Sequence, residues 1–220
     1  MFGKKQTDKL MQKLKENDLD CLLLINLDLP QLDPNFYYFT GMDGYEHSIV
    51  LLSEEPAVYV PGFETARAEK ESSIKNVNKT KKGLTKELGK ILKGKKVGIN
   101  GDFMPFNFYK KLKKKGIEMT DFSKEIKKLR VIKNKKEIEY IRKATKVSKD
   151  VLKDVDTGKS EIEIASELMY KYFQNGMKPG YDPIVAFDAD STVPHFVPTN
   201  AKAGKSLLID SGAAFKNYTA

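Results

Sequence analysis

The 220-residue sequence is poor in several side chains that support particular kinds of chemistry. It has no tryptophan, two histidines (His47 and His195) and one cysteine, Cys21, which excludes an internal disulfide. Cys21 lies in the apolar run CLLLI, so we interpret it as a small buried thiol. That run is the longest apolar stretch and is far shorter than the roughly 20 residues that span a bilayer. Because the start of the chain also has no apolar signal core, the sequence predicts a soluble, cytoplasmic protein with no membrane partner.

Motifs for nucleotide and serine-hydrolase chemistry are also absent. The chain contains neither G-x-G-x-x-G nor G-x-x-x-x-G-K-[ST], and it has no G-x-S-x-G. These patterns surround phosphates with backbone N–H groups or expose a nucleophilic serine. A nucleotide-driven motor and a serine hydrolase therefore have no support from motifs.

Positive charge is concentrated in one stretch. The chain has 39 Lys and Arg against 30 Asp and Glu, a net charge of +9, while residues 75–135 hold 20 basic and 5 acidic side chains. The lysine run at residues 110–115 would suit nucleic acid, but few of the basic residues are arginines, which form bidentate contacts with bases and phosphates. Phe108, Tyr109 and Leu112 fall at helical spacing, which places the lysines on the opposite face. We therefore predict a solvated helix face and no nucleic-acid partner.

The length allows two domains, and the first half alternates between helical and strand patterns. The apolar segment at residues 21–26 predicts a strand buried on both faces, and residues 47–53 and 57–60 predict a hairpin. Further predicted elements are a helix at 62–70, a strand at 74–77, a helix at 84–92, a strand at 96–100, the lysine-rich helix and a strand at 117–122. We predict an α/β domain over residues 1–125 and a linker over residues 126–133.

The second half opens with two helix-start signals. Asn134 with Glu137, and Ser160 with Glu163, have the spacing of a capping box, in which two side chains satisfy the free N–H groups of a helix start. Apolar stripes follow both signals and predict two paired helices. Beyond residue 178, short apolar runs separated by turns predict strands at 183–187, 195–198, 206–210 and 212–218.

Of the two histidines, only His195 is a candidate for chemistry. His195 lies in the segment TVPHFVPTN, where Pro194 and Pro198 stiffen an extended segment and hold the ring in one direction. Local sequence leaves two interpretations of His195 open, a functional side chain and an exposed loop histidine. His47 begins a predicted strand, and we interpret it as structural.

Asp210 is a candidate because it ends the apolar run LLID and precedes a Ser-Gly pair. A carboxylate buried there needs a metal, a cation or several N–H donors, but D-S-G also suits an Asx-turn, so both interpretations stay open. Asp182, Asp188 and Asp190 have no metal-binding spacing, and we interpret them as turn residues.

Five segments in order carry a family resemblance. They are LRVIKNKKEIEYIRKA (129–144), GKSEIEIASEL (158–168), YDPIVAF (181–187), PHFVPT (194–199) and LLIDSGAAFKNY (207–218). Together they resemble the Xaa-Pro peptidases, the family of prolidase and proline-specific aminopeptidase, which is related to methionine aminopeptidase and creatinase. The resemblance implies an α/β creatinase-like N-terminal domain (1–125) and, after the linker, an incomplete α+β pita-bread catalytic domain (134–220).

The resemblance also implies an activity and a site. Members of this family hydrolyse the peptide bond before proline with two divalent metal ions, commonly manganese or cobalt and sometimes zinc, which two aspartates, a histidine and two glutamates hold. Asp210 matches the first aspartate, and His195 matches a histidine that lies beside the substrate and binds no metal. The implied partners are a peptide with proline after the scissile bond and a second copy of the chain in a homodimer.

The sequence departs from the family pattern at two places. In the family a second aspartate follows in D-I-T-R, and Ala220 occupies the position before it, so the other four ligands would lie beyond Ala220. We therefore expect that this chain alone neither retains the metal ions nor hydrolyses peptides. Phe187 and Asp188 stand where many relatives have small residues. Two alternative functions stay open: a non-catalytic, peptidase-like module that binds peptides or proteins, and a creatinase-like amidinohydrolase.

Overall fold

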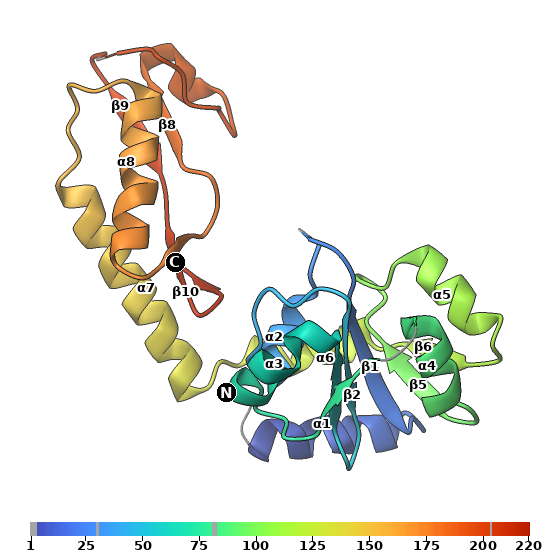
Figure 1. Cartoon of the computed structure of the whole chain (residues 1–220). Coiled ribbons are helices and arrows are strands. Elements are labelled where there is room, and N and C mark those ends of the chain that lie inside the picture. Colours follow the sequence, from blue (N-terminus) through green and yellow to red (C-terminus); the bar gives the residue numbers. More distant parts are fainter. Residues whose placement is uncertain (1–3, 30, 81–82, 203) are drawn as a thin grey trace. The chain divides into compact units, whose positions relative to one another are not determined.

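The structure is a computed structural model that describes residues 4–29, 31–80, 83–202 and 204–220. Its contacts divide the chain into two compact units, Met1–Ile132 and Lys133–Ala220 (Figure 1). Within the described residues, no helix has both the length and the apolar character needed to cross a membrane.

The first unit is built on a mixed sheet with the strand order β4-β3-β2-β1-β5-β6. Its strands are β1 (Cys21–Asn26), β2 (Ser48–Leu52), β3 (Ala57–Val60), β4 (Val77–Lys79), β5 (Lys96–Ile99) and β6 (Glu118–Asp121). β1 is central, antiparallel to β2 and parallel to β5, which in turn lies parallel to β6. The predicted hairpin is confirmed, since β2 and β3 pair antiparallel, whereas the strand predicted at 74–77 begins later, at Val77.

Helices cover both faces of this sheet (Figure 1). One face carries α1 (Lys4–Glu16), α2 (Pro34–Thr40), α3 (Thr65–Glu71, after the short 3-10 helix Gly62–Glu64) and α6 (Ser123–Val131), and the other carries α4 (Leu84–Ile91) and α5 (Phe106–Lys113). Leu22 and Leu24 of β1 pack on the first face, and Cys21, Leu23 and Ile25 pack on the second. The prediction of a strand buried on both faces is confirmed, and the two covered faces explain why β1 is apolar at successive positions.

Two further interpretations of the first half are confirmed. Cys21 is fully buried, and burial raises the pKa of its thiol to about 11, so the thiol stays protonated at neutral pH. In α5, Phe108 and Leu112 are buried while the lysines of residues 110–115 are exposed. These lysines form the solvated face that the spacing predicted.

The segment predicted as a linker, residues 126–133, is helical over most of its length. α6 extends to Val131, and Ile126 is fully buried in the core on the α1 side of the sheet. The boundary between the two units falls after Ile132. Lysines and an arginine occupy many positions of this short helix, so its single buried isoleucine produced no recognisable apolar stripe.

The second unit pairs two helices with two small sheets. Its elements are α7 (Lys135–Lys153), α8 (Glu161–Gln174), β7 (Lys178–Pro179), β8 (Ile184–Phe187), the 3-10 helix η2 (Asp188–Thr192), β9 (Leu207–Asp210), β10 (Ala213–Phe215) and β11 (Tyr218–Thr219). β8 pairs with β9, and β10 pairs with both β7 and β11. Both predicted capping boxes are present, at Asn134 with Glu137 and at Ser160 with Glu163.

Two predicted strands of this unit are wrong. Residues 195–198 are irregular, since the prolines on either side have no N–H group for a strand ladder. Residues 212–218 contain a hairpin, because Lys216 and Asn217 adopt positive φ angles of 53° and 61° between β10 and β11. Two successive left-handed residues form the tight turn that suits the twist of a hairpin.

Candidate functional site

The hairpin of β8 and β9 positions both candidate residues. The strands pair antiparallel, with Ile184 opposite Asp210 and Phe187 opposite Leu207. His195 lies in the connection between the strands, residues 188–206, and Asp210 lies at the far end of β9 from that connection. Asp210 lies three residue steps beyond Leu207, or about 10 Å along the strand. No hydrogen bond or ion pair joins the two candidates in the described residues.

Asp210 lies on the exposed side of β9. Leu207 and Ile209 pack against the core of the second unit, while Leu208 and Asp210 alternate with them and are exposed. The expectation that Asp210 needs partners because it is buried is therefore wrong for this chain. Because the carboxylate remains in contact with water, it does not pay the free-energy cost of burying a charge.

Two tyrosines hold the end of β9. Tyr181 donates its hydroxyl proton to Oδ1 of Asp210 at 2.5 Å, and this bond, with burial and the Asp210 charge, raises the pKa of Tyr181 to about 12. The buried Tyr172 of α8 lies 2.8 Å from Ser211, hydroxyl to hydroxyl. Asp210 thus accepts from a side chain and not from its own turn, which disfavours the Asx-turn interpretation.

His195 is exposed and has a left-handed backbone. Its φ angle is 54°, and it lies in a turn that follows η2. The prediction that the flanking prolines hold this segment extended is therefore wrong at His195 itself. Histidine is among the residues that adopt the left-handed region more readily, and such conformations persist where the surrounding structure constrains them.

Glu161 is a buried carboxylate that the sequence analysis missed. It is the first residue of α8 and is fully buried. Oε1 accepts from the Phe187 N–H at 2.8 Å, and Oε2 accepts from the N–H and the hydroxyl of Thr199 at 3.0 and 2.7 Å. Burial raises the pKa of Glu161, but the hydrogen bonds from Thr199 and Phe187 outweigh that effect and leave the pKa lowered. A glutamate one residue after a capping serine looks like ordinary helix-start chemistry, so no local signal distinguished it.

Asp188 joins the two ends of the connection between β8 and β9, residues 188–206. Its Oδ1 accepts from the N–H groups of Lys205 and Ser206 at 2.8 and 2.9 Å. Phe187, beside it, is buried in the core of the unit. The Phe187-Asp188 pair, which departs from the family pattern, therefore supplies packing and a turn, consistent with the interpretation of Asp188 as a turn residue. Asp190 lies in η2, and Asp182 is exposed in the segment before β8.

The described residues do not by themselves form a metal site. They contain no group of three or more His, Cys, Asp or Glu side chains placed to hold an ion. The exposed carboxylate of Asp210 has the oxygen chemistry that divalent ions such as Mn²⁺ prefer, but it is a single donor.

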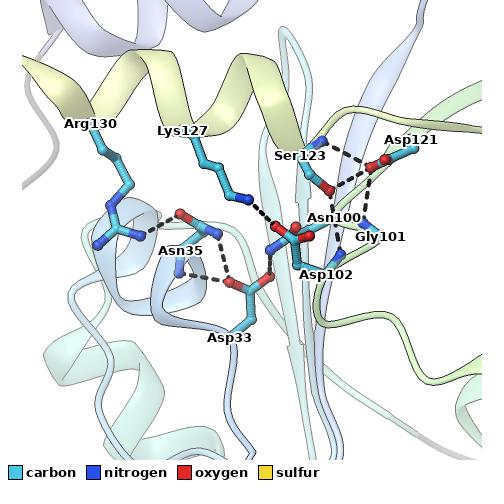
Figure 2. A network of polar contacts seen from close by, with 9 residues as sticks. All are labelled: Asp33, Asn35, Asn100, Gly101, Asp102, Asp121, Ser123, Lys127 and Arg130. Carbon is cyan, nitrogen blue, oxygen red and sulfur yellow. Dashed lines mark hydrogen bonds and ion pairs between the residues drawn. The ribbon is translucent and has the colours of Figure 1, made fainter.

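The first unit carries a second polar cluster, at the carboxyl ends of parallel strands (Figure 2). Its members are Asp33, Asn35, Asn100, Gly101, Asp102, Asp121, Ser123, Lys127 and Arg130. Asp33 is buried and accepts from the backbone and side-chain N–H groups of Asn35 and from Asn100, each at 2.8 Å. Asp121 accepts from the N–H of Gly101 and from Ser123. This cluster joins α2, the end of β5 and the start of α6, so it is structural.

A cleft of about 860 Å³ opens at the same edge, between the loops after β1 and β5. Open α/β sheets often bind ligands at this edge. The two carboxylates in the lining already have cationic or basic neighbours: Asp102 pairs with Lys127 at 2.7 Å, and Asp28 lies 3.5 Å from His47. His47 itself is exposed, and its backbone N–H donates to the Leu27 carbonyl at 2.9 Å.

Comparisons with known proteins match both units. The family model described as "Creatinase/Prolidase N-terminal domain" matches residues 6–132, and that of "Metallopeptidase family M24" matches residues 139–220. The chain is 32% identical to an Xaa-Pro dipeptidase of Pyrococcus horikoshii over 96% of this chain and 60% of that protein, and 33% identical to one of Pyrococcus furiosus over 98% and 62%. The crystal structure of the Pyrococcus horikoshii prolidase superposes with a TM-score of 0.84 at 31% identity, over 98% of this chain and 62% of that chain. The chain thus spans about three fifths of the length of these relatives.

Proposed function

Because this chain belongs to the creatinase/prolidase family, with an N-terminal domain of that type followed by M24 metallopeptidase sequence, we propose that its protein is a metallopeptidase that hydrolyses the peptide bond before proline. The observation that carries the proposal is the similarity to two Xaa-Pro dipeptidases over nearly the whole chain. The match to the M24 metallopeptidase family, over residues 139–220, includes the His195 connection and Asp210. The substrate is a dipeptide or longer peptide with proline after the scissile bond.

We assign Asp210 to metal binding. Its carboxylate is exposed at the end of β9, and the hydroxyl of Tyr181 fixes one of its oxygens, which leaves the other free to bind a cation. We propose manganese or cobalt, or alternatively zinc, as the two divalent ions of the native site. Divalent ions in peptidases activate water at neutral pH and polarise the scissile carbonyl.

We assign His195 to substrate contact. Its exposed ring has no hydrogen-bond partner among the described residues, so both ring nitrogens are available to a peptide. A neutral or protonated imidazole can donate to the carbonyl oxygen as negative charge develops there, which lowers the barrier to hydrolysis.

The same family membership supports our proposals that the native protein forms a homodimer and acts in the cytoplasm.

The test compares hydrolysis and metal content in the native protein. We expect cleavage of Xaa-Pro dipeptides in preference to matched Xaa-Ala dipeptides, and about two divalent ions per subunit. Asp210→Ala should lose metal and activity together. Asp182→Ala is the matched control, because Asp182 is also an exposed carboxylate of the second unit and has no described hydrogen bond.

Each alternative function predicts a different result. A native protein that binds peptides but contains no metal and cleaves nothing would establish the non-catalytic module. Cleavage of a guanidino compound without cleavage of Xaa-Pro dipeptides would establish the amidinohydrolase. Full metal content in Asp210→Ala would remove the assignment of Asp210.

A further inference from the structure

The segment that carries His195, residues 187–199, is fixed by hydrogen bonds near its two ends. Apart from the turn at residues 194–195, no hydrogen bond or ion pair joins residues 194–198 to another described residue, and Pro194 and Pro198 have no N–H to donate. The position of His195 therefore depends on the anchors at either side of it. Toward the N-terminus the anchor is η2 and Phe187, and toward the C-terminus it is Thr199.

Glu161 bonds to both anchors. One of its oxygens accepts from Phe187, and the other accepts twice from Thr199, so a single carboxylate bridges the two ends of the segment. The backbone of α8 adds to this tie, since the N–H of Glu161 donates to Ala201 at 3.0 Å and that of Ile162 donates to Thr199 at 2.9 Å. These bonds also satisfy the free N–H groups at the start of the helix.

The element that carries Glu161 is itself firmly packed. Ile164, Ala165, Leu168 and Tyr172 of α8 are buried in the core of the second unit, and α8 lies against β8 (Figure 1). Tyr172, eleven residues after Glu161, contacts Ser211 beside Asp210. The helix thus contacts the His195 segment near its start and the Asp210 turn about three helical turns later.

We propose that Glu161 is a positioning residue, which bridges Phe187 and Thr199 and so holds the His195 ring in place. An apolar residue could fill the same volume, but it would leave the buried N–H group of Phe187 without an acceptor and would break both bonds to Thr199. A buried charge is tolerated here because three donors satisfy it. The effect on catalysis rests on the proposed function, whereas the effect on the position of His195 does not.

The test uses Glu161→Gln in the native protein, with Glu163→Gln as the matched control. Glu163 lies in the same first turn and also accepts from two donors, the N–H and hydroxyl of Ser160, but it does not contact the His195 segment. Glutamine keeps the size of glutamate but turns an N–H group toward donors. We expect the amides of Phe187 and Thr199 to exchange about tenfold faster in Glu161→Gln, and to be unchanged in Glu163→Gln.

The imidazole resonances report the ring directly. The chain has two histidines, and His47 in the first unit is an internal reference. In Glu161→Gln the His195 resonance should shift or broaden while the His47 resonance stays the same. Unchanged exchange at Phe187 and Thr199, or an unchanged His195 resonance in a folded variant, would overturn the proposal.

A double-mutant cycle separates positioning from general stability. Glu161→Gln should lower kcat about tenfold or more with a smaller change in KM, and should have little further effect in the His195→Ala background. Additive losses of kcat would mean that Glu161 does not act through His195 and would overturn the proposal. If the wild-type protein cleaves no Xaa-Pro peptide, the proposed function fails, and the exchange and resonance measurements still decide the role of Glu161.

Discussion

In the first unit Asp33 is 2% exposed, and its carboxylate accepts hydrogen bonds from Asn35 and Asn100 (Figure 2). In the second unit, by contrast, Asp210 is exposed and accepts from Tyr181. The second unit also has a buried, fully bonded carboxylate, Glu161, but the segment that it anchors carries the exposed His195. Buried polar groups that hydrogen-bond to each other stabilise the fold. An exposed polar group on a loop that is fixed at its ends is available to a ligand. The comparison predicts where substitutions affect stability and where they affect activity.

The largest expected effect is in the core of the first unit. Leu23→Ala removes a fully buried side chain from the centre of the sheet and should cost about 3 kcal/mol of unfolding free energy. Leu208→Ala, at a side chain of β9 that is 41% exposed, should cost less than about 1 kcal/mol. Denaturant unfolding with amide exchange at both strands measures the two values. Equal losses of unfolding free energy in Leu23→Ala and Leu208→Ala would contradict the contrast between the buried and the exposed strand positions.

A smaller effect separates the two aspartates. Asp33→Ala leaves buried amide groups of Asn35 and Asn100 without their acceptor and removes a helix cap, so it should cost about 2 kcal/mol. Asp210→Ala should cost less than about 0.5 kcal/mol, because its carboxylate is exposed. Asp28→Ala is the control for the first unit, since Asp28 lies in the same loop but is exposed. A loss at Asp210 as large as that at Asp33 would contradict the contrast.

The smallest effect is one of pH, and its sign differs between the two buried carboxylates. Burial raises the pKa of Asp33 above its ordinary 3.8, so the part of its contribution to stability that comes from the protonated form is present below pH 3.8 and is lost as pH rises through the raised pKa. Hydrogen bonds outweigh burial and lower the pKa of Glu161 below 4.5, so its contribution is present above pH 4.5 and is lost as pH falls through the lowered pKa.

The measurement is the unfolding free energy of the wild type relative to Asp33→Asn and to Glu161→Gln, between about pH 3 and 7. We expect the difference to decrease with pH for Asp33→Asn and to increase with pH for Glu161→Gln. Slopes of the same sign for both variants would show that burial and hydrogen bonding do not shift the pKa values of the two carboxylates in opposite directions.

Much of the fold could be predicted from local patterns. The apolar run of β1 predicted a strand with two covered faces, and the capping boxes at Asn134 and Ser160 predicted where α7 and α8 begin. These signals depend on neighbours within four residues, which the sequence displays directly. α6 was missed because its buried contact, Ile126, is a single residue among lysines.

In the candidate site, too, local patterns revealed some residues and missed others. His195 and Asp210 stand out because of the short motifs around them, and their roles remain proposals. Glu161 could not be found from its neighbours, because its hydrogen-bond partners Phe187 and Thr199 lie 26 and 38 residues further along the chain. The left-handed turn at His195 likewise depends on anchors outside the TVPHFVPTN segment.

The sequence by itself determined the α/β order of the first unit, its central strand, the starts of α7 and α8 and the two candidate residues, since each depends on periodicity or on spacing between near neighbours. The α+β class of the second unit was an expectation from the family resemblance. Only the tertiary structure decided which carboxylates are buried, which are exposed, and that Glu161 bridges the two ends of the His195 segment. The reason is physical: burial and hydrogen bonding between distant residues arise only when the chain has folded and brought their donors and acceptors together.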